Sequence, residues 1–182
     1  MRNAKKLEYG FSNEEFEIRL QRAQELLYEN KLDALLITIP SNLRYFTGID
    51  TNFWESPTRP WFLVIPLSGS PIAVIPEIGE KLFKKTFVKD IHTWPSPNLN
   101  GDDISPLKSL LESLPSRFGA IGAELGKEMS IRMPVLDLGL LQDNFKFDIV
   151  DGASLIWSLR IIKTLNEIKK IEKAAQIVSK VF

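Results

Sequence analysis

The run LDALLITI at residues 32–39 constrains the fold of this chain more than any other feature of the sequence. A strand with one face in water alternates apolar and polar residues, whereas an apolar run of strand length is typical of a strand buried on both faces. Such a strand needs a layer of structure on each side. The run therefore predicts a layered α/β domain, and Pro40, Ser41 and Asn42 are expected to break the strand.

The segment before this run predicts a helix that begins after Ser12 and ends near Asn30. Ser12 and Glu15 form a capping box, in which each side chain can satisfy a free backbone N–H of the first turn. Phe11 is placed to pack onto Phe16 as a hydrophobic staple. One face of the helix is apolar, with Phe16, Leu20, Ala23 and Leu27.

The segments after the run alternate between strand and helix patterns. WFLVIP at 61–66 and PIAVIP at 71–76 are β-type runs joined by a short turn, which predicts an antiparallel hairpin. Residues 42–48 are short and mixed, and Gly48 ends them. The other expected elements are strands at 88–94, 118–123 and 145–150 and helices at 77–86, 103–114, 129–142 and 152–159. This alternation indicates the α/β class with a mixed sheet.

The last stretch, Leu159 to Phe182, predicts an amphipathic helix whose apolar residues recur every three or four positions on one face. Thr164 and Glu167 form a second capping box, and no glycine or proline stop signal follows. We expect this apolar stripe to need a surface to pack on and the sequence to be the front part of a longer protein. The stripe consists of Ile161, Leu165, Ile168, Ile171, Ala175, Val178 and Phe182.

Composition excludes several classes of protein. Lys plus Arg and Asp plus Glu number 23 each, so the formal net charge of zero argues against a nucleic-acid binder. The absence of cysteine excludes disulfides and is compatible with a reducing compartment. No apolar run approaches the ~18 residues of a membrane span, and the N-terminus has no apolar signal-peptide region. We therefore expect a soluble cytoplasmic protein that binds neither nucleic acid nor membrane.

Few residues offer catalytic or metal-binding chemistry. His92 is the single histidine, so a zinc site is nearly excluded and His92 is interpreted as an ordinary structural or surface residue. Asp102 and Asp103 are interpreted as carboxylates at a helix N-terminus rather than as a weak cation site. The G-x-S-x-G elbow and the phosphate-binding loop are absent. Glu124 is interpreted as a strand-end residue, with a buried and paired carboxylate as the alternative.

The loop at 49–60 is the best local candidate for a binding function. Arg59 can offer a bidentate fork to a carboxylate, and Trp54 and Trp61 can form the walls of a small pocket. The structural alternative is that Trp54 packs on the edge of the sheet while Arg59 pairs with Glu55.

Two motifs resemble the N-terminal domain of the creatinase/prolidase/Xaa-Pro aminopeptidase family. The first is SNLRYFTG at 41–48, which follows the buried strand and precedes the aromatic-rich loop. The second is LRIIKTLNEIKKIEKAAQI at 159–177, which is similar to the segment that joins this domain to a catalytic domain of pita-bread shape. IGAELG at 121–126 also resembles a family strand that ends in G-x-E. The residues that match the joining segment are Arg160, Lys163, Glu167, Ile168, Ile171 and Ala174.

The resemblance implies a three-layer α/β/α domain with a mixed sheet and ribonuclease-H-like topology over residues 1–158. Residues 159–182 would be the linker and first helix of a catalytic domain. In the family that domain binds two divalent metal ions (Mn, Co or Zn) through two Asp, one His and two Glu, so no catalytic residue or metal ligand is assigned in this chain. Creatinase works without metals, so the parent is expected to be an Xaa-Pro peptidase or a hydrolase of a small amide-like carboxylate substrate.

The resemblance also bears on partners. In the family this domain mediates homodimerisation, and its loop reaches the active site of the partner subunit. In creatinase-like members an Arg and an aromatic residue of that loop bind the substrate carboxylate. By placement, Phe53, Trp54, Arg59 and Trp61 are the candidate substrate-binding residues. The alternative is a stand-alone ligand-binding or interaction module without catalytic activity.

Overall fold

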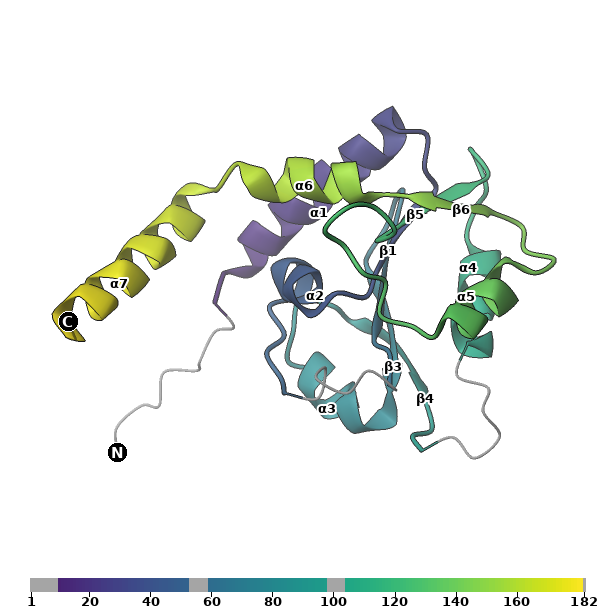
Figure 1. Cartoon of the computed structure of the whole chain (residues 1–182), viewed down its shortest axis with the longest axis horizontal. Helices are drawn as coiled ribbons and strands as arrows, with labels where there is room; N and C mark the ends of the chain where they lie inside the picture. The colour runs from purple at the N-terminus through teal and green to yellow at the C-terminus, as the bar shows by residue number, and fades with distance from the viewer. Residues whose placement is uncertain (1–9, 53–58, 98–103, 182) are drawn as a thin grey trace.

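The computed structural model describes residues 10–52, 59–97 and 104–181 (Figure 1). Within these ranges six strands form one sheet in the order β4-β3-β2-β1-β5-β6. The strands are β1 (Ala34–Ile37), β2 (Phe62–Pro66), β3 (Ile72–Pro76), β4 (Asp90–Trp94), β5 (Ala120–Ala123) and β6 (Asp148–Asp151). The helices are α1 (Asn13–Glu29), α2 (Pro40–Thr47), the 3-10 helix η2 (Glu77–Gly79), α3 (Glu80–Phe83), α4 (Ser105–Ser113), α5 (Val135–Gln142), α6 (Ala153–Ile161) and α7 (Leu165–Val181).

The sheet is mixed, as the sequence predicts. β2 pairs antiparallel with both β1 and β3, so the hairpin predicted at 61–76 is confirmed. β1 is parallel to β5, β5 is parallel to β6, and β3 is parallel to β4. The carboxyl ends of the neighbouring inner strands β1 and β5 therefore lie side by side.

Both faces of β1 are covered, which explains its uninterrupted apolar pattern. Leu35 and Ile37 belong to a core cluster that includes side chains of α1, α2 and α6. Ala34 and Leu36 belong to a second cluster, on the other face, that includes side chains of α4 and α5. Figure 1 shows these helix layers on opposite sides of the sheet. The predicted three-layer α/β/α class is confirmed.

Helix α1 matches its prediction closely. The Ser12 side chain accepts a hydrogen bond from the Glu15 N–H at 3.4 Å, and the rings of Phe11 and Phe16 meet edge to face with centroids 6.4 Å apart. The Glu15 carboxylate, which a capping box would direct to the Ser12 N–H, instead accepts hydrogen bonds from Thr164 and Asn166.

Helix α2 differs from its prediction. Pro40 was expected to break the strand, and β1 does end before it, at Ile37. The sequence did not predict that Pro40 would occupy the first turn of α2, where a residue without an N–H is tolerated and its fixed φ suits a helix. The helix ends at Gly48, whose φ of 73° is left-handed and whose N–H donates to the Arg44 carbonyl. The mixed segment 42–48 is therefore a capped helix.

Other predicted elements are present with shifted ends. The segment 77–86 forms only η2 and the short α3, and the strand expected at 145–150 begins at Asp148. In 129–142 only Val135–Gln142 is helical. Pro134 explains this start, because a proline disfavours helical geometry in the residue before it.

The two C-terminal helices are divided a few residues later than the sequence predicted, which placed helices at 152–159 and 159–182. α6 ends at Ile161 and α7 begins at Leu165. The Thr164 capping box starts the new helix, since the Thr164 N–H donates to Glu167 at 2.8 Å and the Glu167 N–H donates to the Thr164 hydroxyl at 3.2 Å. Figure 1 shows α7 extending away from the layered domain. None of the helices within the described ranges is long and apolar enough to cross a membrane.

Candidate functional site

A buried carboxylate lies where β1 and β5 end. Glu124 follows β5 and has no exposed surface. One of its oxygens accepts from the Thr38 N–H at 2.6 Å, the Thr38 hydroxyl at 2.7 Å and the Ile39 N–H at 2.7 Å. The other oxygen accepts from the Asn42 side-chain amide at 2.6 Å. The interpretation of Glu124 as a plain strand-end residue is therefore wrong, and the paired-carboxylate alternative is right.

Burial raises the pKa of Glu124 above its ordinary value, and the hydrogen bonds from Asn42, Thr38 and Ile39 oppose that rise. The carboxylate also connects to α6. The Asn42 side-chain oxygen, which is not used by Glu124, accepts from the Arg160 guanidinium. Arg160, a residue of the joining motif, thus ties α6 to the start of α2.

A second buried charge lies between α1, α2 and α7. Arg19 is 1% exposed, and its guanidinium approaches Glu15 at 3.3 Å and Glu167 at 3.4 Å. It donates to the Tyr45 carbonyl at 2.6 Å. The guanidinium also lies over the rings of Phe11 and Tyr45, 4.2 and 4.3 Å from their centroids. One cation therefore contacts three helices.

Residues next to the start of α7 complete this site. Glu15 accepts from the Thr164 hydroxyl at 2.7 Å and from the Asn166 amide at 2.9 Å. Burial acts to raise the pKa of Glu15, but hydrogen bonds from Asn166, Thr164 and Arg19 and the charge of Arg19 outweigh it, so the pKa is lowered. We call Glu15, Arg19, Thr164, Asn166 and Glu167 the Arg19 cluster.

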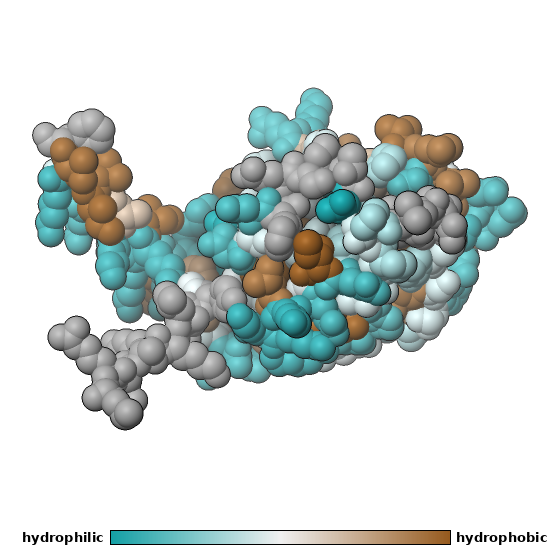
Figure 2. All heavy atoms as spheres, turned by 90° about the horizontal axis from the view of Figure 1, so that it is seen from below, coloured by the Kyte–Doolittle hydropathy of each residue, from teal (hydrophilic) through white to brown (hydrophobic). Residues whose placement is uncertain are grey.

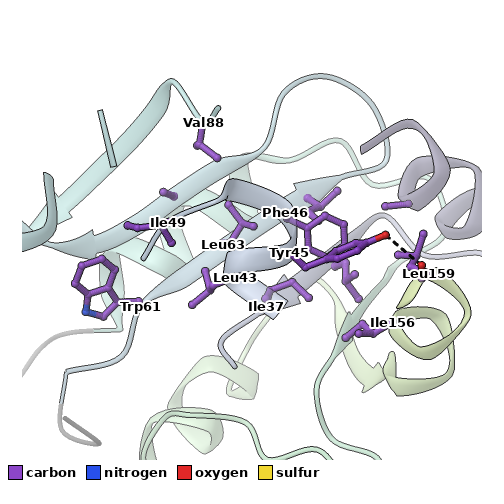
Figure 3. Close-up of a cluster of buried hydrophobic side chains, with 14 of the residues drawn as sticks. Ile37, Leu43, Tyr45, Phe46, Ile49, Trp61, Leu63, Val88, Ile156 and Leu159 are labelled. Carbon is purple, nitrogen blue, oxygen red and sulfur yellow. Dashed lines mark hydrogen bonds between the residues drawn. The ribbon is translucent and has the colours of Figure 1, made fainter. Parts of the chain in front are cut away.

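Tyr45 attaches α6 from the side of α2. Its hydroxyl donates to the Leu159 carbonyl at 3.1 Å, drawn as a dashed line in Figure 3. Burial raises the pKa of Tyr45, so the phenol stays neutral and keeps this proton. Leu159 is itself fully buried. The expected linker start at residue 159 therefore falls inside a helix that packs on the domain.

Helix α7 has no buried side chain. Its apolar residues are strongly exposed, with Leu165 at 76%, Ile171 at 55% and Val178 at 55%. Figure 2 shows an apolar band along this helix, at the left of the view. A contiguous exposed apolar surface of this kind marks an interaction site. We call Leu165, Ile168, Ile171, Ala175 and Val178 the α7 stripe.

Of the four residues predicted to bind substrate, Arg59 and Trp61 are among the described residues. Phe53 and Trp54 lie outside the described residues, as does Glu55. Arg59 is exposed, whereas Trp61 is 3% exposed and belongs to the core labelled in Figure 3. The Trp61 ring packs on the ring of Phe83, so it fills the domain interior. A substrate contact by Arg59 stays a prediction.

Trp61 also leaves no room at Gly79. A Cβ added there would lie 2.4 Å from the Trp61 ring, so Gly79→Ala is expected to lower the free energy of unfolding by about 1–3 kcal/mol through overpacking. Urea denaturation measures this loss. Gly139→Ala is the control, because no atom lies within 4 Å of its Cβ position, and it should be neutral or slightly stabilising. Equal stability of the two variants would contradict this packing.

The described residues offer no ligand set for a metal ion, since no three of their His, Cys, Asp or Glu side chains are grouped for one. His92 lies on β4 with its side chain 48% exposed, 3.1 Å from Asp90. The predicted helix-start carboxylates Asp102 and Asp103 fall outside the described ranges.

Comparison with known proteins gives a family and a fold. The sequence profile of the Creatinase/Prolidase N-terminal domain matches residues 19–162. Dipeptidase PepE from Mycobacterium ulcerans is 25% identical, with a TM-score of 0.70, over 94% of this chain and 43% of its own. A dipeptidase from Pyrococcus horikoshii is 27% identical, with a TM-score of 0.70, over 90% of this chain and 42% of its own.

A third structure matches this chain over nearly all of its own length. It is a Creatine_N superfamily domain of a dipeptidase from Streptococcus thermophilus, 20% identical, with a TM-score of 0.60, over 78% of this chain and 98% of its own. No curated protein matches significantly in sequence. The chain spans about two fifths of the length of the M. ulcerans and P. horikoshii dipeptidases. With the profile matching most of its residues, the chain belongs to the Creatinase/Prolidase N-terminal domain family.

Proposed function

We propose that this chain serves as the non-catalytic N-terminal domain of a hydrolase that cleaves Xaa-Pro peptides or a small amide-like substrate with a carboxylate. Family membership supports this proposal, as does the match to two dipeptidases over about two fifths of their length. The observation that carries it is the α7 stripe, an apolar face on a helix without a buried side chain.

The proposed occupant of the α7 stripe is a catalytic domain that follows in the same chain. Burying one Leu, Ile or Val side chain contributes about 1.5–3 kcal/mol, so covering several of them would hold two domains together firmly. A domain joined directly to α7 is also present at high effective concentration, which favours this contact over one with a separate protein.

The family's two divalent ions, Mn, Co or Zn, belong in this proposal to the following domain. The described residues group no three potential ligands, so they do not fit such a metal pair. The proposal includes a homodimer in the cytoplasm. The lack of cysteine and the zero net charge support a reducing compartment and argue against a nucleic-acid partner.

Arg59 carries the proposed substrate contact. In the full-length protein, Arg59→Ala is expected to lower kcat/KM for an Xaa-Pro dipeptide, because a charged hydrogen bond to the substrate carboxylate is lost. The loss of transition-state stabilisation calculated from the two kcat/KM values should be roughly 1–3 kcal/mol. Steady-state kinetics measures this change.

The matched control is Arg117→Ala. Arg117 is exposed, and its backbone N–H donates to the Asp33 carboxylate, just before β1. Arg59 precedes β2, which runs antiparallel to β1. The two arginines therefore lie at opposite ends of the sheet. An unchanged kcat/KM in Arg59→Ala, or an equal loss of kcat/KM in both variants, would contradict the proposed substrate contact by Arg59.

The proposed function itself is tested by expressing the full reading frame and assaying both Xaa-Pro dipeptides and small amide-like carboxylates, with and without a chelator. Hydrolysis that the chelator abolishes is expected for a metal-dependent parent, and hydrolysis of a small amide-like carboxylate that resists the chelator for a creatinase-like parent. The absence of both activities would contradict the proposal.

A further inference from the structure

We propose that the Arg19 cluster fixes the direction of α7 relative to the layered domain, in place of apolar packing. The consequence, that the cluster sets the angle at which the α7 stripe meets a following domain, rests on the proposed function. The positioning itself is a property of this chain and is testable without any activity.

The contacts of α7 with the described domain are concentrated at its first turns. Glu167 approaches Arg19 at 3.4 Å, and Asn166 donates to Glu15 at 2.9 Å. One turn further on, the Lys170 ammonium lies 4.9 Å from the centroid of the Phe11 ring. No side chain along α7 is buried, so apolar packing does not hold the helix against the domain.

Polar contacts of this kind define a direction better than apolar ones do. Hydrogen bonds weaken steeply when their angle departs from linearity, whereas the hydrophobic effect is non-directional. Arg19 is 1% exposed and Glu15 is 6% exposed, so water competes little for these bonds. Both carboxylate oxygens of Glu15 accept hydrogen bonds from the start of the α7 segment, one from Thr164 and the other from Asn166.

The cation at the centre is itself fixed. Arg19 donates to the Tyr45 carbonyl at 2.6 Å, and its guanidinium lies over the rings of both Phe11 and Tyr45. A guanidinium held this way cannot follow α7 if the helix swings.

The connector 162–164 is therefore held on both sides. On the α6 side, Tyr45 donates to the Leu159 carbonyl and Arg160 donates to Asn42. On the α7 side, Thr164 donates to Glu15 at 2.7 Å. The break between α6 and α7, which would otherwise act as a hinge, is thereby made rigid.

The test uses a double variant, Asn166→Ala with Glu167→Gln, that changes only the α7 side of the cluster. Gln at 167 keeps the capping box with Thr164, because a capping box accepts Glu or Gln, but removes the charge that faces Arg19. The buried pair of Arg19 and Glu15 stays in place. The control is Gln176→Ala with Glu172→Gln, which likewise removes one side-chain amide and one carboxylate charge, at exposed positions of α7.

The chain has no cysteine, so spin labels at Lys180→Cys on α7 and Glu112→Cys on α4, both exposed, form a single pair. Labelled protein is diluted into unlabelled protein, and pulsed dipolar spectroscopy gives the distance distribution. We expect one narrow peak in the parent and the control, and loss of that peak to a broad distribution in the Asn166→Ala, Glu167→Gln variant. Circular dichroism and urea denaturation check that α7 and the domain remain folded.

A narrow distribution that persists in the double variant would overturn the proposal, as would a parent distribution that is already broad. If the double variant fails to fold, Glu167→Gln alone carries the same comparison. The measurement uses this chain without a catalytic domain, so its failure is distinguishable from failure of the proposed hydrolase function.

Discussion

Replacing Glu124 with alanine is expected to lower the free energy of unfolding by at least about 3 kcal/mol, because it leaves several buried donors without an acceptor. The carboxylate accepts from two backbone N–H groups, of Thr38 and Ile39, as well as from the Thr38 hydroxyl and the Asn42 amide. Each unsatisfied buried donor costs about 1–3 kcal/mol. The loss also frees Asn42, through which Arg160 holds α6.

Urea denaturation of Glu124→Ala measures this effect, and Glu112→Ala, at an exposed position of α4, is the control. Glu124→Gln should fall between the two. Its oxygen can replace the one that Thr38 and Ile39 use, but its NH₂ group then faces the NH₂ group of Asn42. Stability of Glu124→Ala equal to that of the control would show that these hydrogen bonds contribute nothing net.

Replacing Arg19 with methionine is expected to lower the free energy of unfolding by about 3–5 kcal/mol, the range for removing one partner of a buried ion pair. Arg19 is the cation between Glu15 and Glu167, and Glu15 is only 6% exposed. Without the guanidinium, the Glu15 carboxylate stays buried with neutral donors alone, and the Tyr45 carbonyl loses its donor.

Arg22→Met is the matched control, since Arg22 is on the same helix and half-buried. Unfolding by urea, followed by a double-mutant cycle with Glu167→Gln, separates the cost within the domain from the coupling to α7. Equal losses in Arg19→Met and Arg22→Met would contradict the role assigned to the buried cation.

Features with a local cause could be predicted from the sequence. The apolar run at 32–39 indicated a strand covered on both faces, because consecutive residues of a strand point to opposite faces and those of β1 are all buried. The hairpin at 61–76 and the Thr164 capping box likewise depend on neighbours a few residues apart. The burial of Trp61 carried a signal too, since Leu63 and Ile65 share its side of the strand and face the same core.

The polar sites could not be predicted, because their partners are remote in sequence. Glu124 lies 86 residues from Thr38, and Glu15 lies 151 residues from Asn166. Their meeting depends on β5 pairing parallel with β1 and on the course of the chain after α6. Pro40 shows a different limit, since the same residue ends a strand and begins a helix.

The most direct test of the proposed domain role is to sequence the native message beyond the codon for Phe182. The proposal predicts that the reading frame continues for roughly 200 residues, the size of one more domain. Two Asp, one His and two Glu in the family's order would indicate a metal-dependent parent, and a frame without them would favour a creatinase-like reaction. A stop codon directly after Phe182 would contradict the proposal and leave a stand-alone binding module as the function to test.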